Sequence, residues 1–325
     1  MDPVLLLRRE YDPARLLAAH PPKLKHPHKR LVFDRACPGD AKHNGPLGLT
    51  RWRAAPLPEV LVLASTELVI TSGYYDYLGS GPGVWHVNFA DPQLFVAYGS
   101  ALLAQDELQA AEIPLLGSLR EALLAEHQPA LTEEHLEPTP VLVTNAERRC
   151  VLATEPNLDA GRVYGLYGNQ FASATPDVVS RAIRLLEPPT TTNLIAIAAP
   201  GGGRGAYFRR DLERILVTAY SGFAAARAES RRLWPNAPVD IRTGFWGCGA
   251  FGGNRHVMTM LQLLAARLAG ADRLQFYAFD ARGELDVRAG VAALDRVLAS
   301  GDSTIEALLE GIADLDFEWG VGDGT

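Results

Sequence analysis

Cysteine and methionine are scarce in this sequence, with three of each in 325 residues. The cysteines, Cys37, Cys150 and Cys248, stand too far apart for a disulfide framework or a zinc-binding pattern. So sparing a use of cysteine fits a reducing compartment. We therefore predict a cytoplasmic protein that holds no metal and no cofactor.

Long apolar runs are also missing, and none reaches the length of a membrane span. At the N-terminus the basic pair Arg8-Arg9 follows the apolar residues instead of preceding them, which is unlike a signal peptide. The net charge of −7 argues against broad, charge-driven binding to nucleic acid. We expect a monomer that neither enters membranes nor binds nucleic acid generally.

What remains is the composition of an ordinary globular protein, with 47% apolar and 21% charged residues. The start of the chain is rich in proline, histidine and lysine, and we expect an N-terminal extension (1–57) ahead of one domain (58–325). His26 and His28 are candidate metal ligands in the extension, but their surroundings are more typical of a solvated loop.

The hydrophobic pattern after residue 58 predicts alternating strands and helices. Strands are expected at 60–64, 67–71, 84–90, 94–98, 140–144, 150–154, 193–199, 238–242 and 273–279. Helices are expected at 104–126 with a break at Pro114, and at 176–186, 208–229, 253–269, 287–299 and 303–314. Such alternation predicts an α/β fold in which helices cover both faces of a sheet.

The most informative run is residues 243–253, Thr-Gly-Phe-Trp-Gly-Cys-Gly-Ala-Phe-Gly-Gly, between an expected strand and an expected helix. Backbone amides in such a turn, at the positive end of a helix dipole, favour an anion such as a diphosphate. Trp246 and Phe251 favour a ribose or base alongside, although a turn without any ligand is the alternative. The run lacks the Gly-Lys-Ser/Thr ending of a Walker loop, which argues against ATP hydrolysis.

A second glycine cluster occupies residues 201–206 and loosely matches a dinucleotide-binding pattern through Gly201, Gly203 and Ala206. Pro200 interrupts it, and no strand with an acidic residue follows about 20 residues later, as that fold requires. We favour a surface loop for this cluster.

Acidic residues gather at Asn88-Phe-Ala-Asp91 and at Gln105-Asp106-Glu107, the second opening an expected helix. Carboxylates in a first helical turn are stabilised by the helix dipole, by about 0.3–1 kcal/mol each, and need no further role. The functional alternative is a carboxylic acid that protonates the leaving oxygen of a glycosidic bond.

The run at 243–253 resembles the diphosphate loop of the poly(ADP-ribose) glycohydrolases, Thr-Gly-Asn-Trp-Gly-Cys-Gly-Ala-Phe-Gly-Gly, from which only Phe245 departs. The segments 219–223 (Ala-Tyr-Ser-Gly-Phe) and 274–279 (Leu-Gln-Phe-Tyr-Ala-Phe) are also similar to that family. The resemblance spans residues 58–280. It implies a macrodomain-like, three-layer α/β/α fold with a central mixed sheet that binds ADP-ribose at the strand ends.

Carried over by position, the resemblance implies that Glu107 is the catalytic acid and Asp106 its acidic neighbour. It also implies that Asp91 and Gln105 lie against the substrate. A ring from the loop at 161–172 would stack on adenine.

The resemblance assigns the following residues to the ligand. The diphosphate would be held by Gly247, Cys248, Gly249, Ala250, Phe251 and Gly252, with Phe251 against the distal ribose. The stacking ring would be Tyr167 or Phe171.

Three departures surround the ribose that carries the scissile bond. The triple glycine of the family falls on Phe95-Val96-Ala97, its Phe-Ala-Asn asparagine is Asp91, and the loop asparagine is Phe245. The diphosphate loop is nearly intact, so binding of ADP-ribose is better supported than cleavage of a polymer.

Two functions follow. In the first, which we favour, a hydrolase removes ADP-ribose from a modified protein or nucleotide, with Glu107 as general acid and then as base for water. In the second, the domain is a reader that binds ADP-ribose without turnover. The acidic pair favours the hydrolase, and the loss of the triple glycine favours the reader.

Overall fold

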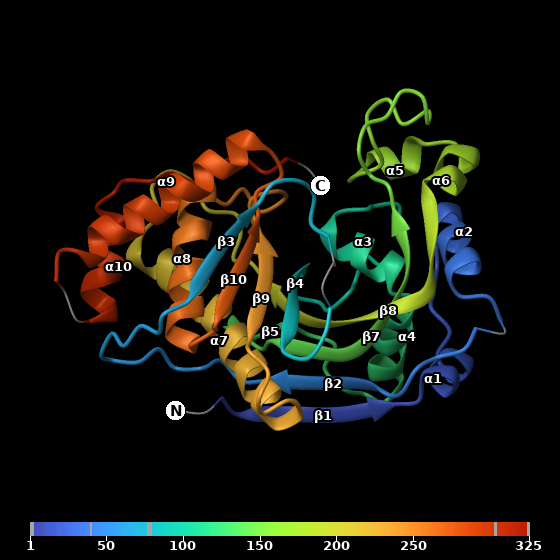
Figure 1. Cartoon of the computed structure of the whole chain (residues 1–325), viewed down its shortest axis with the longest axis horizontal. Helices are drawn as coiled ribbons and strands as arrows, with labels where there is room; N and C mark the ends of the chain where they lie inside the picture. The colour runs from blue at the N-terminus through green and yellow to red at the C-terminus, as the bar shows by residue number, and fades with distance from the viewer. Residues whose placement is uncertain (1–2, 40, 77–79, 302–303, 324–325) are drawn as a thin grey trace.

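The computed structural model describes residues 3–39, 41–76, 80–301 and 304–323 (Figure 1). The strands are β1 (Leu5–Tyr11), β2 (Leu47–Trp52), β3 (Glu67–Thr71), β4 (Val84–Ala90), β5 (Glu133–Glu134), β6 (Glu137–Pro138), β7 (Val141–Leu152), β8 (Ile183–Ala198), β9 (Asp240–Gly244) and β10 (Arg273–Tyr277). The helices are α1 (Pro13–Ala19), α2 (Pro27–Ala36), α3 (Gln105–Glu112), α4 (Leu115–Ala125), α5 (Gln170–Ser173), α6 (Pro176–Ala182), α7 (Arg209–Leu233), α8 (Arg255–Ala269), α9 (Ala281–Leu298) and α10 (Ile305–Ala313).

Within these residues, eight strands form one mixed sheet in the order β1-β2-β7-β8-β4-β9-β10-β3. The strands from β1 to β8 pair antiparallel, and those from β8 to β3 pair parallel. In Figure 1, β1 and β2 run across the bottom of the view while β3, β9 and β10 rise steeply, so the sheet is strongly twisted.

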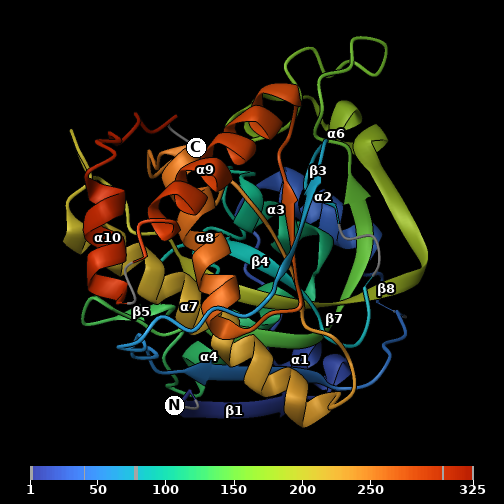
Figure 2. The same ribbon diagram turned by 60° about the vertical axis from the view of Figure 1, so that its left-hand side comes forward.

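Helices cover both faces of the sheet, as the alternation of side chains in β8 shows. Ile195 and Ile197 are buried with residues of α7, α8 and α10, whereas Leu194 and Ala196 are buried with residues of α1, α3 and α4. Successive side chains of a strand point to opposite faces, so both faces of β8 lie in a core. In Figure 2, α8, α9 and α10 lie together at one side of the molecule and α2 and α6 at the other. The predicted α/β class with a central mixed sheet between helices is confirmed.

The parallel strands β4 and β9 are paired only from Val84 to His86, against 240–242. Beyond this point the Tyr75 hydroxyl donates to the carbonyl oxygens of Val87 (3.2 Å) and Arg242 (2.6 Å), one on each strand. The Gln105 side chain continues along β4, accepting from the Phe89 amide at 2.8 Å and donating to the Val87 carbonyl at 3.2 Å. Side chains thus satisfy the edge of β4 where the ladder ends.

Several predicted elements are wrong. Residues 94–98 form turns instead of a strand, because Phe95 has a φ of 52° and amides bond to carbonyls three residues back. The segment 60–64 is extended but forms only an isolated bridge, from Val60 to Thr304. The two strands expected at 140–144 and 150–154 are one strand, β7, with register shifts within it.

The expected N-terminal extension contributes to the sheet and to a helical layer. Strands β1 and β2 form its edge beside β7, and α2 packs against α3 and α6. The solvated loop expected around His26 and His28 is wrong, since His26 caps α2 and His28 is 5% exposed. The boundary at residue 57 stays a prediction.

Across the described ranges, none of the helices has the length and apolar character needed to cross a bilayer.

Candidate active site

The glycine-rich run forms the loop between β9 and α8, as the sequence predicted. Trp246 is fully buried and its indole N–H donates to the Ile197 carbonyl at 3.0 Å, which ties the loop to β8. Asn254 caps α8 by accepting from the amide of His256 at 2.9 Å. At Gly247 φ is 76° and a Cβ would lie 2.6 Å from that of Ala199, so glycine is needed there.

Three successive amides in this loop remain available. The amides of Cys248, Gly252 and Gly253 donate to carbonyls within the loop, at 3.0, 3.0 and 2.8 Å. The amides of Gly249, Ala250 and Phe251 donate to no acceptor among the described residues. Available amides ahead of a helix N-terminus form a concave anion-binding site.

The Cys248 thiol beside these amides is not a reactive group. It contacts the Trp246 carbonyl at 3.8 Å, and burial raises its pKa to about 12. A raised pKa disfavours the thiolate, which is the nucleophilic form of cysteine. In the part of the chain that the structure describes, no cluster of His, Cys, Asp and Glu side chains could hold a metal ion.

Loops that follow β4, β8 and β9 meet at one edge of the sheet, because these neighbouring strands are parallel. Phe251 lies so close to the loop after β8 that a Cβ at Gly201 would be 2.6 Å from its ring. The crevice outside the carboxyl ends of parallel strands is the usual place for a ligand in α/β folds. The cluster at 201–206 is a mostly exposed loop that borders this edge.

The acidic pair opens α3 next to the end of β4. The Glu107 carboxylate accepts from the Ala104 amide at 3.0 Å, and the Asp106 carboxylate accepts from the Asn88 side-chain amide at 2.9 Å. Each acidic residue is only 5% exposed. Asp91 stands at the end of β4, where its carboxylate accepts from the Gln93 amide at 2.8 Å.

Burial is the first cause of a raised pKa in both carboxyls of the pair. The pKa of Asp106 rises to about 8, through burial and then the neighbouring Glu107 charge, so Asp106 holds a proton at neutral pH. The pKa of Glu107 is also raised by burial, while the Lys29 ammonium opposes the rise. Asp91 adds negative charge that raises both. The three acidic groups therefore share one electrostatic environment.

Lys29 is a site residue that the sequence pattern did not reveal. It projects from α2 behind the acidic pair, is 2% exposed, and donates to the Glu107 carbonyl at 3.2 Å. Burial lowers the pKa of its ammonium to about 8. Lys29 lies in a segment rich in lysine, arginine and histidine, where nothing distinguishes it from its exposed neighbours.

The two candidate stacking rings occupy different environments. Tyr167 is 42% exposed, and its hydroxyl lies inward toward the Gln105 amide and the Glu107 carboxylate. Burial of that hydroxyl raises its pKa to about 12. Phe171 is fully buried, with its ring centroid 5.4 Å from that of His28, and offers no face to a base. Only Tyr167 of the two has an open face.

Gln105 and the departing aromatic residues are engaged within the fold. Both ends of the Gln105 side chain are bonded to the backbone of β4. Phe95 is fully buried among the residues packed around α1 and α4. Phe245 packs on Phe276 at 5.2 Å, under the Arg255 guanidinium.

Residues 320–323 contact the glycine-rich loop. The Gly320 amide donates to the Gly252 carbonyl at 2.8 Å, and the Asp323 amide to the Gly249 carbonyl at 3.4 Å. The Asp323 carboxylate also raises the pKa of Tyr167. Residues 320–323 therefore lie along the loop 247–252, and the Asp323 carboxylate is close enough to Tyr167 to influence its hydroxyl.

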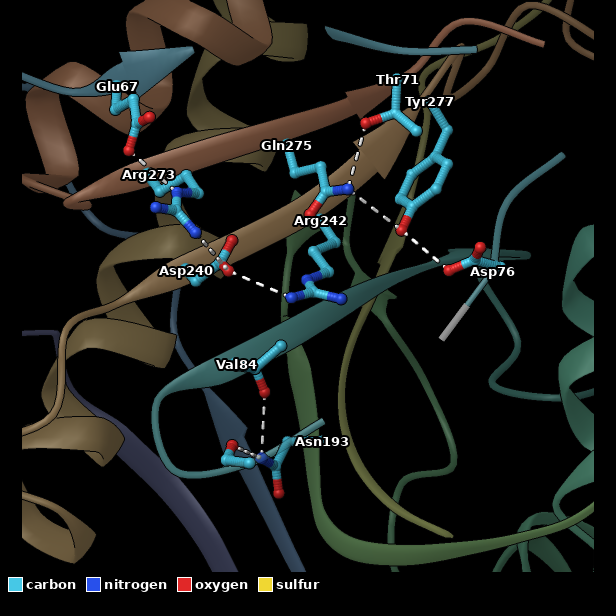
Figure 3. Close-up of polar contacts among 11 residues, drawn as sticks. Glu67, Thr71, Asp76, Val84, Asn193, Asp240, Arg242, Arg273, Gln275 and Tyr277 are labelled. Atoms are coloured by element: carbon cyan, nitrogen blue, oxygen red, sulfur yellow. Dashed lines mark hydrogen bonds and ion pairs between the residues drawn. The ribbon is translucent and has the colours of Figure 1, made fainter. Parts of the chain in front are cut away.

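A polar network covers the sheet face of β9, β10 and β3 that lies opposite α8 (Figure 3). Gln275 donates to the hydroxyl oxygens of Thr71 (3.1 Å) and Tyr277 (3.3 Å), and Tyr277 donates to Asp76 (3.1 Å). Burial raises the pKa of Tyr277 to about 12. The network holds the segment after β3 against the sheet.

A hollow of about 990 Å³ lies away from this site, near the beginning of β4. It is bounded by parts of β1, β2, β7, β8 and the end of α7. None of the predicted site residues lines it.

Comparison with known proteins identifies the loop-bearing segment. Residues 164–285 match the family described as "Poly (ADP-ribose) glycohydrolase (PARG), Macro domain fold". The match confirms the resemblance over this segment, which includes Tyr167 and the whole loop 243–253. Asp91, Asp106 and Glu107 lie outside it.

Solved structures of the same family are similar to most of the chain at low identity. The poly(ADP-ribose) glycohydrolase of Thermomonospora curvata is 17% identical over 88% of this chain and 84% of that one, with a TM-score of 0.42. The structure of the same enzyme bound to the inhibitor ADP-HPD is 17% identical over 88% of this chain and 84% of that one, with a TM-score of 0.41. The enzyme of Deinococcus radiodurans in complex with ADP-ribose is 16% identical over 89% of this chain and 95% of that one, with a TM-score of 0.42.

Proposed function

We propose that this protein is an ADP-ribosyl glycohydrolase, which binds ADP-ribose on the loop 247–252 and uses Glu107 as its acid and base. The observation that carries the proposal is the set of three available amides at Gly249, Ala250 and Phe251. These amides follow the carboxyl end of β9, and the acidic pair lies beside the end of the neighbouring strand β4. A diphosphate needs several hydrogen-bond donors, and backbone amides supply them without a charged side chain.

The chemistry fits a buried carboxyl with a raised pKa. Glu107 gives its proton to the acceptor oxygen as the bond from that oxygen to the anomeric carbon breaks. A water molecule then bonds to the anomeric carbon and loses a proton to Glu107, which restores the acid. Asp106, protonated at neutral pH, adds no second negative charge beside the reacting centre. The acceptor in this proposal is a modified protein side chain or nucleotide.

The reader is the second candidate, and the tail favours it. Residues 320–323 cross the loop, so ligand entry requires them to move or to join the site. A reader tolerates slow entry, whereas an enzyme that turns over needs repeated exchange. Against it stands the acidic pair, since a buried carboxyl costs stability that mere binding does not require.

Calorimetry with ADP-ribose tests the binding site. Gly249→Val places a branched side chain where the backbone would meet the diphosphate, and affinity should fall at least about tenfold, or about 1.4 kcal/mol. Gly81→Val is the control, because a Cβ at Gly81 meets nothing within 4 Å. Equal affinity of the folded Gly249→Val protein and the wild type would remove the diphosphate assignment.

Release of ADP-ribose tests the chemistry. The substrates are mono-ADP-ribosylated protein, ADP-ribosylated nucleic acid and poly(ADP-ribose), each with wild type and Glu107→Gln. We expect release from one of the first two by wild type and none by the variant, with ADP-ribose affinity retained. A wild type that binds ADP-ribose but releases it from none of the three is a reader, and full activity of Glu107→Gln would exclude Glu107 as the acid.

A further inference from the structure

Lys29 places an ammonium group in the protein interior, directly behind the acidic pair. The ammonium donates a hydrogen bond to the Glu107 carbonyl at 3.2 Å, and the Phe171 ring centroid is 5.7 Å from its nitrogen. Burial of an unpaired ammonium is costly, because water is lost and nothing replaces it. Among the residues that the structure describes, the nitrogen forms no ion pair within 4 Å, and the charges that stabilise it are those of Glu107 and Asp106 on α3.

The position of Lys29 is fixed by the helix that carries it. α2 starts at Pro27 after the His26 cap, and the His28 ring nitrogen lies 2.9 Å from the Phe171 carbonyl. The His28 contact joins α2 to α5, and α2 also packs on α3 and α6. The N-terminal segment thus brings a positive charge to a site otherwise built from later parts of the chain.

The charges around the ammonium are unequal in their effect on the two carboxyls. Glu107 and Asp106 face it from α3, and His26 and His28 lie on its own helix. Among the influences that favour ionisation, Lys29 is the largest for Glu107, whereas the Asn88 hydrogen bond is the largest for Asp106. Asp91 opposes the ionisation of both.

An acid and base in one reaction must both give up a proton and take it back. Burial raises the pKa of Glu107 and favours its protonated form, and the one form of the pair in which both carboxyls are charged is the most costly. One ammonium beside two carboxyls gives a neutral cluster when a single proton is shared by the carboxyls. The form in which Glu107 has given up its proton while Asp106 keeps its own is therefore neutral overall, and the Lys29 charge favours this form.

We propose that Lys29 is a positioning residue for the acidic pair: its buried ammonium holds the first turn of α3 and enables Glu107 to release its proton. The proposal rests on the proposed function for its consequence, but its physical content concerns only the ionisation of Glu107. It also assigns a role to the N-terminal segment, which delivers this charge.

The test measures Glu107 directly. In protein with ¹³C-labelled glutamate carboxyls, the Glu107 signal is assigned by its loss in Glu107→Gln and followed from pH 4 to pH 9. Lys29→Gln keeps a donor for the Glu107 carbonyl without the charge, and Lys29→Arg keeps the charge. Lys25→Gln, at an exposed position of the preceding loop, is the matched control.

We expect the Glu107 pKa to rise by about one unit in Lys29→Gln, roughly a tenfold change in proton affinity, and to stay near the wild-type value in Lys29→Arg and Lys25→Gln. An unchanged Glu107 pKa in Lys29→Gln would overturn the proposal. So would equal shifts in the Gln and Arg variants, because the effect would then come from altered packing and not from charge. If Lys29→Gln does not fold, Lys29→Arg is compared with wild type at pH 9, where Lys29, with its pKa of about 8, is largely neutral and arginine is charged. A Glu107 carboxyl that is ionised to the same degree in both proteins at this pH would then overturn the proposal.

The titration is independent of turnover, so failure of this proposal is distinguishable from failure of the proposed function. Where ADP-ribose release is measurable, the alkaline limb of kcat/KM should move to higher pH in Lys29→Gln and return in Lys29→Arg. A purely structural lysine would lower kcat/KM at every pH without moving the limb.

Discussion

Replacing Asp106 with Asn should stabilise the protein, and by more at pH 7 than at pH 5. The Asn side chain keeps an oxygen to accept from Asn88 but has no charge to bury. In the folded wild type the pKa of Asp106 is about 8, against an ordinary value of 3.8. Because the pKa of Asp106 is raised in the folded state, the contribution of Asp106 to the free energy of unfolding is complete below pH 3.8 and is lost as the pH rises through about 8.

The magnitude follows from proton uptake. Between the two pKa values the folded state binds one more proton than the unfolded state, so each pH unit lowers wild-type stability by about 1.4 kcal/mol from this group. The advantage of Asp106→Asn should thus grow by about 3 kcal/mol between pH 5 and pH 7, an upper bound because Glu107 titrates together with Asp106.

Urea unfolding at pH 5, 6 and 7, extrapolated to water, measures this difference. Asp34→Asn, at an exposed position of α2, should follow the wild-type curve in parallel. If Asp106→Asn differs from wild type by a constant amount across the range, Asp106 is ionised in the folded protein and the assignment of the proton is wrong.

Three further outcomes are expected. Tyr167→Ala should weaken ADP-ribose binding by about 1–3 kcal/mol in calorimetry, because its ring is the one with an open face, and unchanged affinity would exclude it as the stacking ring. Phe171→Ala should instead destabilise the fold, by about 3–5 kcal/mol in urea unfolding, since the ring is fully buried; a smaller loss than from Tyr167→Ala would contradict its core position. Asp323→Asn should strengthen ADP-ribose binding severalfold, and more so at low salt, because a negative charge leaves the entrance; equal affinity at two ionic strengths would show that the tail does not face the ligand.

The loop at residues 243–253 could be predicted because its features are encoded by residues close together in the sequence. Glycines with positive φ, a helix cap and a buried tryptophan all lie within twelve residues, so the sequence records the whole loop in one place. The start of α3 was predictable for the same reason, as was its break before α4 at Pro114. These features depend on neighbours along the chain.

Features that depend on distant partners were not predictable. Lys29 meets Glu107 across 78 positions of sequence, and β1 joins the sheet through β2, about 40 residues away. The run 94–98 has the apolar content of a strand, yet its buried side chains (Leu94, Phe95 and Tyr98) pack with residues of α1 and α4 instead of with strand neighbours. Periodicity cannot distinguish burial in a turn from burial in a sheet.

The turn at Phe95 changes how strongly the replacement of the triple glycine by Phe95-Val96-Ala97 argues against catalysis. Three side chains in place of a triple glycine argued for a blocked ribose pocket, and hence for a reader. Phe95 adopts the left-handed conformation that glycine favours, and its ring is turned into the core. The left-handed conformation of Phe95 costs about 1–2 kcal/mol. In return, the Phe95 ring lies in the core and not at the surface. Val96, 41% exposed, is the departing side chain with surface to offer a ligand, so the loss of the glycines counts less against catalysis than the sequence implied.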